Sequence, residues 1–313
     1  MEIARHISLK DKNWFKTGGH ANYFAQPTTA HEFAQAVAYA QQNHLATFIL
    51  GQGANILISD AGFDGLVIQP QLKEIAIESL DENYAALTVG AGVSIHDLID
   101  YCLEHNLLGL EEFSGIPSSI GGALYINLHY FEFLIEQFLL HAHVIHKETR
   151  EIITVDRSWF NFGYNKSRLQ TEPYFLISAT FKLKKATDLE TAFAKGRRKE
   201  IIRHRASRYP AANTCGSFFR NFYIDEVTLI SNGKKMIYVA YYLDKIGVKG
   251  QLKVGDAIVS YQHANMLVNQ GNATSADIIN LARTMQELVL KQFGITPKAE
   301  CELVGFKEYP LLF

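Results

Sequence analysis

Two loops rich in small residues could bring main chain close to a charged or flat ligand. Residues 51–55 read Gly-Gln-Gly-Ala-Asn and follow a short apolar run. Glycines there let successive N–H groups turn toward an anion such as a pyrophosphate. The third glycine of the dinucleotide fingerprint is missing, and the next run is β-like instead of helical. A tight turn that binds no ligand is an equally good interpretation of this segment.

The second loop spans residues 114–123 and reads Ser-Gly-Ile-Pro-Ser-Ser-Ile-Gly-Gly-Ala. Such a density of small residues lets main chain approach a ligand closely. An ordinary surface loop is the alternative. Two such loops together favour a cradle for a dinucleotide more than either does alone.

Two further segments carry polar side chains that could act on a substrate. Residues 215–221 read Cys-Gly-Ser-Phe-Phe-Arg-Asn, a plausible active-site strand around Ser217. No Gly-x-Ser-x-Gly pattern surrounds this serine, which argues against a hydrolase nucleophile, and a turn or capping serine is the alternative. On an alternating strand Glu300 and Glu302 share one face, where two solvated carboxylates are the simpler interpretation.

The elements that must position these residues alternate between helix and strand in the first third of the chain. Capping sequences predict helices that start after Thr29, Ser94 and Thr274, the last ending at Gly294. Strict alternation over residues 175–183 predicts a half-buried strand, and residues 141–155 predict a hairpin. A basic helix over residues 188–205 is either a solvated connection or an edge that faces an anion.

The composition describes a folded globular protein without a strong electrostatic bias. Lys and Arg number 30 and Asp and Glu number 32, so no long-range field attracts nucleic acid or an anionic membrane. Three cysteines form neither a disulfide framework nor a zinc pattern, which favours a reducing compartment and predicts no metal. The N-terminal residues lack a secretory apolar core and no run can span a bilayer, so we expect a cytoplasmic protein.

Six segments, in order, resemble the UDP-N-acetylenolpyruvoylglucosamine reductase (MurB) family. They include matches to its L-G-x-G-S-N-x-L, G-I-P-G-x-V-G-G-A, F-x-Y-R-x-S and G-S-x-F-K-N-P patterns. The segments are residues 13–19, 50–57, 115–123, 162–167, 216–221 and 263–272. Each match is modest, but six in the family's order, over nearly the whole chain, are specific.

The resemblance implies an α+β fold: an FAD-binding fold of the vanillyl-alcohol-oxidase (PCMH) type with two subdomains, plus a C-terminal α+β substrate-binding domain. We place the subdomains at residues 1–72 and 73–200, and the substrate domain at residues 201–313. FAD would be bound by the two loops described above. The implied cofactor-binding residues are Gly51, Gln52, Gly53, Ala54, Asn55, Ile56, Ser114, Gly115, Ile116, Pro117, Gly121, Gly122 and Ala123.

The resemblance also implies the reaction. NADPH reduces FAD, and the reduced flavin passes a hydride to the enolpyruvyl β-carbon of a UDP-sugar, giving UDP-N-acetylmuramate. By the motif match Ser217 protonates the α-carbon and Glu300 aids stabilisation of the enolate. Arg220 and Asn221 match positions near the substrate's phosphates, and Tyr164 is a further substrate contact. We expect a monomer that binds a small-molecule nucleotide sugar and neither nucleic acid nor a membrane.

The chain departs from the family pattern at several positions. The family arginine of F-x-Y-R-x-S is Asn165 here, which brings no positive charge. Lys166 or Arg168 could supply it, and we assign Arg168 because a guanidinium fork suits a carboxylate. Residues 127–131 replace a family segment rich in Ala and Gly, Phe222 replaces a proline, and Glu302 stands where the family has arginine.

Two alternatives stay open. One is a divergent flavin oxidoreductase of the same fold, although neither small-residue loop has a His or Cys for covalent flavin attachment. The other is a non-catalytic relative that binds flavin or a nucleotide sugar.

Overall fold

The computed structural model describes all residues, 1–313, and divides into two compact units that are discontinuous in sequence. The first unit comprises residues 1–6, 22–52 and 65–205, and the second comprises residues 7–21, 53–64 and 206–313. The expected domain limits at residues 72 and 200 stay a prediction. No helix is both long enough and apolar enough to cross a membrane.

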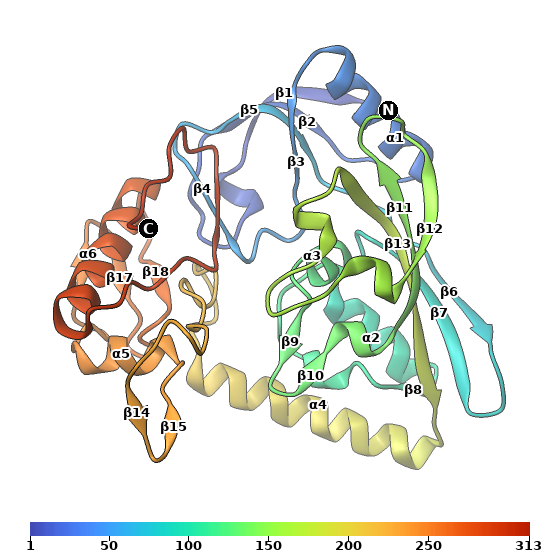
Figure 1. The fold of residues 1–313 in the computed structure, drawn as a ribbon. Helices are drawn as coiled ribbons and strands as arrows, with labels where there is room; N and C mark the ends of the chain where they lie inside the picture. Colours follow the sequence, from blue (N-terminus) through green and yellow to red (C-terminus); the bar gives the residue numbers. More distant parts are fainter. The chain divides into compact units, whose positions relative to one another are not determined.

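The first unit is built on a sheet with the order β12-β11-β13-β7-β6, with β8 paired to β13 (Figure 1). Its central strand, β13, contains the predicted strand, and β11 and β12 form the predicted hairpin. The strands are β6 (Ile75–Ser79), β7 (Tyr84–Gly90), β8 (Leu107–Leu108), β11 (Leu139–His146), β12 (Ile152–Asp156) and β13 (Tyr174–Lys185).

A second, four-stranded sheet has the order β1-β2-β5-β3, with β3 parallel to β5. Its strands are β1 (Ile3–Ser8), β2 (His20–Ala25), β3 (Ala46–Ile49) and β5 (Phe63–Ile68). The short pair β9 and β10 precedes η3 and β11 in the chain. These elements are β9 (His129–Tyr130), β10 (Phe133–Leu134) and η3 (Ile135–Gln137).

Helices α1, α2 and α4 begin where the sequence predicts, whereas α3 begins at Ile120, inside the segment 114–123 that the sequence predicts as a loop, because Ser119 caps a helix there. Thr29 and Ser94 accept hydrogen bonds from the N–H groups of Glu32 and Asp97, at 3.1 and 3.0 Å, and so satisfy donors that a helix start leaves open. The helices are α1 (Ala30–Gln42), α2 (Ile95–Glu104), α3 (Ile120–Tyr125) and α4 (Asp188–Arg208), with 3-10 turns η2 (Glu111–Phe113), η4 (Arg157–Phe160) and η5 (Arg168–Gln170). One core joins α1, α2 and α3 to the sheets.

Several basic side chains of α4 are paired within the protein. Arg197 forms two hydrogen bonds with Glu112, at 2.8 and 2.9 Å, and buried Arg198 bonds Asp100 at 2.9 Å. Arg205 donates to the carbonyl of Gly115 at 3.2 Å. These bonds favour the connecting-helix interpretation over an anion-facing edge.

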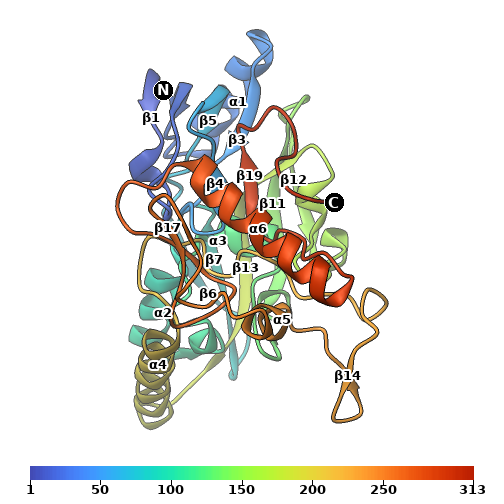
Figure 2. The same ribbon diagram turned by 90° about the vertical axis from the view of Figure 1, so that its left-hand side faces the viewer.

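The second unit packs helix α6 on the small sheet β16-β17-β18 (Figure 2). Phe15 and Leu57, from the two N-terminal segments, are fully buried in the same core as the C-terminal residues. Thr274 caps α6 and Gly294 ends it in the left-handed conformation, as predicted. The elements are η1 (Lys10–Lys12), β4 (Ile56–Ile58), β14 (Ile230–Ser231), β15 (Lys234–Lys235), α5 (Val239–Lys245), β16 (Lys253–Val254), β17 (Ala257–Val259), β18 (Leu267–Asn269), α6 (Ser275–Phe293) and β19 (Glu302–Val304).

Candidate functional site

The loop after β3, residues 51–55, leaves its backbone donors available. None of its five N–H groups donates to an acceptor of the protein, whereas the carbonyl of Gly53 accepts from Trp14 N–H at 2.9 Å. Gly53 has φ +66°, in the left-handed region that glycine adopts without strain. Consecutive amides without internal partners are suited to the oxygens of an anionic ligand.

The two small-residue loops meet within the first unit. A Cβ placed on Gly51 would lie 2.6 Å from Ser119 Oγ, so the approach requires a glycine. Ser119 caps α3 by accepting from Gly122 N–H at 3.2 Å, and Gly121 N–H donates to Ala91 O at 2.9 Å. The tertiary structure thus brings together the segments that the sequence predicts as one cradle.

Two buried polar atoms of the second unit have no hydrogen-bond partner in the protein. They are Asn13 Oδ1 and Thr17 Oγ1, on side chains that are each only 2% exposed. Asn13 packs directly against Gly53, because a Cβ on that glycine would lie 2.7 Å from Asn13 Cα. Buried polar atoms normally have partners, so these open groups and the unpaired amides of residues 51–55 fit a polar cofactor such as FAD.

The strand predicted around Ser217 is not regular: residues 217–219, called the Ser217 strand below, form only isolated β-bridges to two neighbouring segments of the second unit. Ser217 forms an antiparallel bridge with Met266, and Phe219 forms one with Ala299. Gly216, at φ +79°, provides the left-handed residue directly before Ser217. Ser217 itself is partly exposed, so its hydroxyl is accessible at a position fixed by paired backbone on both sides.

Glu300 lies on the neighbouring strand, next to the end of the glycine loop. Its N–H donates to Phe218 O at 2.8 Å, one residue from Ser217. Asn55 Nδ2 donates to Glu300 O at 3.4 Å, and Glu302 N–H donates to Asn55 O at 3.0 Å. Parallel pairing of β4 with β19 continues this contact. The second unit therefore holds Asn55, Ser217 and Glu300 on directly hydrogen-bonded segments.

The predicted phosphate contacts already have partners inside the protein. The Arg220 guanidinium binds both carboxylate oxygens of Glu226, at 2.6 and 2.7 Å. This pair lowers the pKa of Glu226 to about 2. Asn221 Oδ1 accepts from Val239 N–H at the start of α5, at 3.2 Å. Both residues thus have structural contacts as well as their proposed role with substrate.

Tyr164 and Arg168 belong to the first unit; Tyr164 lies within the turn that a bridge between Gly163 and Lys166 closes, and Arg168 begins the 3-10 turn that follows. The Arg168 guanidinium lies over the Trp159 ring, 5.1 Å from its centroid. The Tyr164 ring lies 5.1 Å from that of His129. The assignment of Arg168 as the replacement for the family arginine stays a prediction.

Asn265 lies in one of the family-like segments, but its residue type and position alone predict no role for it. Its side chain forms hydrogen bonds to both backbone polar groups of Phe219. The only signal was the His-Ala-Asn pattern itself, which does not say what the amide contacts.

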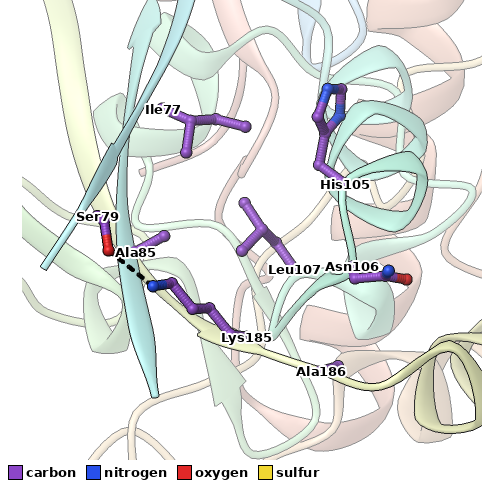
Figure 3. Close-up of a pocket in the computed structure, with 8 residues that line it drawn as sticks. All are labelled: Ile77, Ser79, Ala85, His105, Asn106, Leu107, Lys185 and Ala186. Carbon is purple, nitrogen blue, oxygen red and sulfur yellow. Dashed lines mark hydrogen bonds between the residues drawn. The ribbon is translucent and has the colours of Figure 1, made fainter. Parts of the chain in front are cut away.

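A hollow of about 340 Å³ in the first unit lies among residues that the sequence analysis did not single out (Figure 3). Lys185 donates to Ser79 Oγ at 2.7 Å on one side of it. Ile77, Ala85 and Leu107 provide its apolar lining. None of the predicted site residues contributes to this hollow, so it does not represent the candidate active site.

Comparisons with known proteins agree with this geometry. An FAD binding domain model matches residues 21–149, and a model of the UDP-N-acetylenolpyruvoylglucosamine reductase C-terminal domain matches residues 208–304. UDP-N-acetylenolpyruvoylglucosamine reductase from Orientia tsutsugamushi is 31% identical, over 98% of this chain and 95% of its own. Reductase 2 of the same name from Bacillus cereus is 30% identical, over 95% and 91%.

Solved structures show the same relationship. The crystal structure of the Thermus caldophilus reductase matches with a TM-score of 0.75 and 26% identity, over 97% of this chain and 98% of that one. The 6-hydroxy-D-nicotine oxidase of Arthrobacter nicotinovorans matches with a TM-score of 0.54 at 15% identity, over 94% of this chain and 86% of its own, which shows a shared fold only.

Fold and loops together define an FAD-binding protein of the vanillyl-alcohol-oxidase type, which confirms the predicted fold class. The similarity to the reductases extends over almost the full length of the chain and identifies one family within this class. The chain belongs to the UDP-N-acetylenolpyruvoylglucosamine reductase family, as its sequence motifs predict.

Proposed function

We propose that this chain reduces UDP-N-acetylglucosamine enolpyruvate to UDP-N-acetylmuramate, a step in the synthesis of peptidoglycan precursors, with NADPH and FAD. The observation that carries the proposal is the hydrogen-bonded grouping of Asn55, Glu300 and the Ser217 strand in the second unit. This grouping places the end of the loop at residues 51–55, whose backbone N–H groups have no internal partner, beside segments that carry the Ser217 hydroxyl and the Glu300 carboxyl group.

Residues of both loops would hold FAD. Backbone N–H donors would come chiefly from residues 51–55, because most N–H groups of residues 114–123 already donate within the protein. When bound, FAD supplies the hydride that it receives from NADPH. An enol ether beside a carboxylate accepts hydride poorly until its developing negative charge is stabilised. Ser217 donates the proton to the α-carbon, and Glu300 supports the enolate from the adjacent strand.

Positive groups would hold the anionic parts of the substrate. Arg220 and Asn221 lie directly after the Ser217 strand, where they would face the phosphates. Tyr164 would contact substrate, and Arg168 would supply the charge that Asn165 lacks. Three buried free cysteines accord with a reducing cytoplasm, and the enzyme would act as a monomer.

The experiment that tests the proposal follows flavin colour under anaerobic conditions. Purified protein should be yellow, bleach on addition of NADPH, and regain its colour when the enolpyruvyl nucleotide sugar is added. Bleaching without substrate-dependent recovery would indicate a different acceptor, and thus the divergent oxidoreductase. Protein that binds no FAD even after reconstitution would exclude every flavoenzyme interpretation.

Oligomeric state and coenzyme preference need separate measurements. Light scattering on the eluting holoprotein should give a mass near 35.2 kDa, and a doubled mass would contradict the monomer. The rates of flavin bleaching by equal concentrations of NADPH and NADH show which of the two coenzymes reduces the flavin faster.

A further inference from the structure

Phe218 and Phe219, the two residues after Ser217, have all four of their backbone polar groups hydrogen-bonded. Glu300 N–H donates to Phe218 O from one side. Asn265 provides the other three partners. Its carbonyl accepts from Phe218 N–H at 2.8 Å, its Oδ1 accepts from Phe219 N–H at 3.0 Å, and its Nδ2 donates to Phe219 O at 2.7 Å.

The Asn265 side chain thereby takes the place of a peptide group in a neighbouring strand. It is 3% exposed, and its two bonds to Phe219 are buried. The next residue, Met266, is the bridge partner of Ser217. One short segment therefore fixes both the serine and the dipeptide that follows it.

We infer that Asn265 is a positioning residue that acts through Ser217, holding its strand in register with that of Glu300. The inference rests on the proposed function, because it concerns proton delivery to the substrate. Asn265 needs no contact with substrate or flavin for this role.

We expect this role because removing the Asn265 amide leaves buried backbone groups without hydrogen-bond partners, which costs free energy. Without the amide, the N–H and C=O of Phe219 lose their partners in a buried environment, and the strand relaxes to find others. A displacement of about 1 Å at a proton donor can slow a reaction by about 100-fold. Transfer of hydride from NADPH to FAD needs no proton from Ser217, so this half-reaction should be spared.

The main test measures the two half-reactions of the Asn265→Ala holoenzyme by stopped flow. Reoxidation by the enolpyruvyl substrate should slow by about 10- to 100-fold, while flavin reduction by NADPH stays within about threefold of wild type. The solvent deuterium isotope effect on reoxidation should rise, because protonation then limits the rate.

Asn269→Ala is the matched control. Asn269 is 1% exposed, and its side chain forms three hydrogen bonds, to Phe15 O, Gly271 N–H and Ala273 N–H, against two for that of Asn265. None of the three reaches residues 217–219. This variant should lose comparable thermal stability and keep both half-reactions near wild type, which separates positioning from general destabilisation.

A double variant tests whether Asn265 acts through Ser217. Adding Asn265→Ala to Ser217→Ala should slow reoxidation by no more than about threefold beyond Ser217→Ala alone, because coupled residues are not additive. If Asn265→Ala yields no folded protein, Asn265→Asp keeps the Oδ1 acceptor for Phe219 N–H and replaces the donor with a carboxylate oxygen that repels Phe219 O, so it should also slow reoxidation selectively.

The inference is overturned if Asn265→Ala slows both half-reactions equally, if Asn269→Ala behaves identically, or if the double variant shows fully additive losses. Failure of wild-type protein to reduce the enolpyruvyl substrate would instead contradict the proposed function. The wild-type measurement therefore distinguishes the two failures.

Discussion

The glycine loop at residues 51–55 and the strand at residues 217–219 use their backbones in opposite ways. The loop donates none of its N–H groups within the protein, whereas Phe218 and Phe219 have every backbone polar group paired. Open amides are suited to an external ligand, and paired amides keep a side chain in place. The difference is the one we expect if, as proposed, the loop binds a cofactor with its backbone and the Ser217 strand presents a reactive side chain.

Glycine has a different use in the two regions as well. Gly51 and Gly53 are needed for space, since a Cβ on either would lie within 2.7 Å of another atom. Gly216 has no atom within 4 Å of such a Cβ, and only its positive φ favours glycine. The loop is thus constrained by close packing, and the strand by the backbone turn that leads into it.

The largest effect should follow from removing the side-chain chemistry of the strand. We expect Ser217→Ala to slow reduction of the enolpyruvyl substrate by about 10²–10⁴-fold, the usual contribution of a general acid. Flavin bleaching by NADPH should be unchanged in stopped-flow measurements. Equal losses in both half-reactions would remove Ser217 from its role and weaken the contrast between the two regions.

A smaller effect should identify the charge that replaces the family arginine. Arg168→Ala should slow substrate reduction by about 100-fold, because a positioned charge at a developing enolate has an effect of this size. Lys166→Ala should slow substrate reduction by less than about tenfold in the same assay. If Lys166→Ala lowers kcat more than Arg168→Ala does, Lys166 supplies the missing charge. If both variants lower kcat only slightly and equally, neither residue supplies it.

Substitution in the loop should affect cofactor affinity more than chemistry. Gly53→Ala places a Cβ 2.5 Å from Lys12 O at φ +66°, so we expect FAD to bind about 10-fold more weakly, from roughly 1–3 kcal/mol of strain. Fluorescence titration of apoprotein with FAD measures this change. Gly196→Ala, in the interior of α4 with no atom within 4 Å, is the control and should leave affinity unchanged. Unaltered affinity in Gly53→Ala would contradict the binding role of the loop.

The smallest effect concerns stability beside the reactive strand. Arg220 lowers the pKa of Glu226 from 4.5 to about 2, so its ionised form stabilises the folded state above pH 4.5, and that contribution disappears as the pH falls toward 2. Glu226→Gln should therefore lower the free energy of unfolding by roughly 1–2 kcal/mol at pH 7. Urea unfolding of both proteins should show this difference shrinking between pH 4.5 and 2. A difference independent of pH would exclude the ion pair as its source.

Local patterns predicted much of the secondary structure and the segments of the site. The caps at Thr29, Ser94 and Thr274 and the alternation within β13 appear where the sequence indicates, because capping and alternation involve neighbouring residues. The loop at residues 51–55 was recognised for the same reason, whereas the second predicted loop, residues 114–123, ends in helix α3 from Ile120 onward. The sequence also predicted the family correctly from six ordered segments.

Only the tertiary structure decided which distant segments share a unit. Residues 7–21 and 53–64 pack with residues 206–313, and Asn55 contacts Glu300 across 245 positions of chain. Such contacts arise when a chain buries apolar residues, here Phe15 and Leu57, in a core made mainly by another segment.

Residue type and spacing thus determined three helix starts, the end of the last helix and the chemical groups available for catalysis, while the resemblance of six ordered segments to the family supplied the fold class. They did not determine that the Asn265 amide would pair with the backbone of Phe219, or that Arg220 would be bound by Glu226. A hydrogen bond depends on where two atoms lie after folding, and sequence spacing specifies that only within a single turn of helix or a single hairpin.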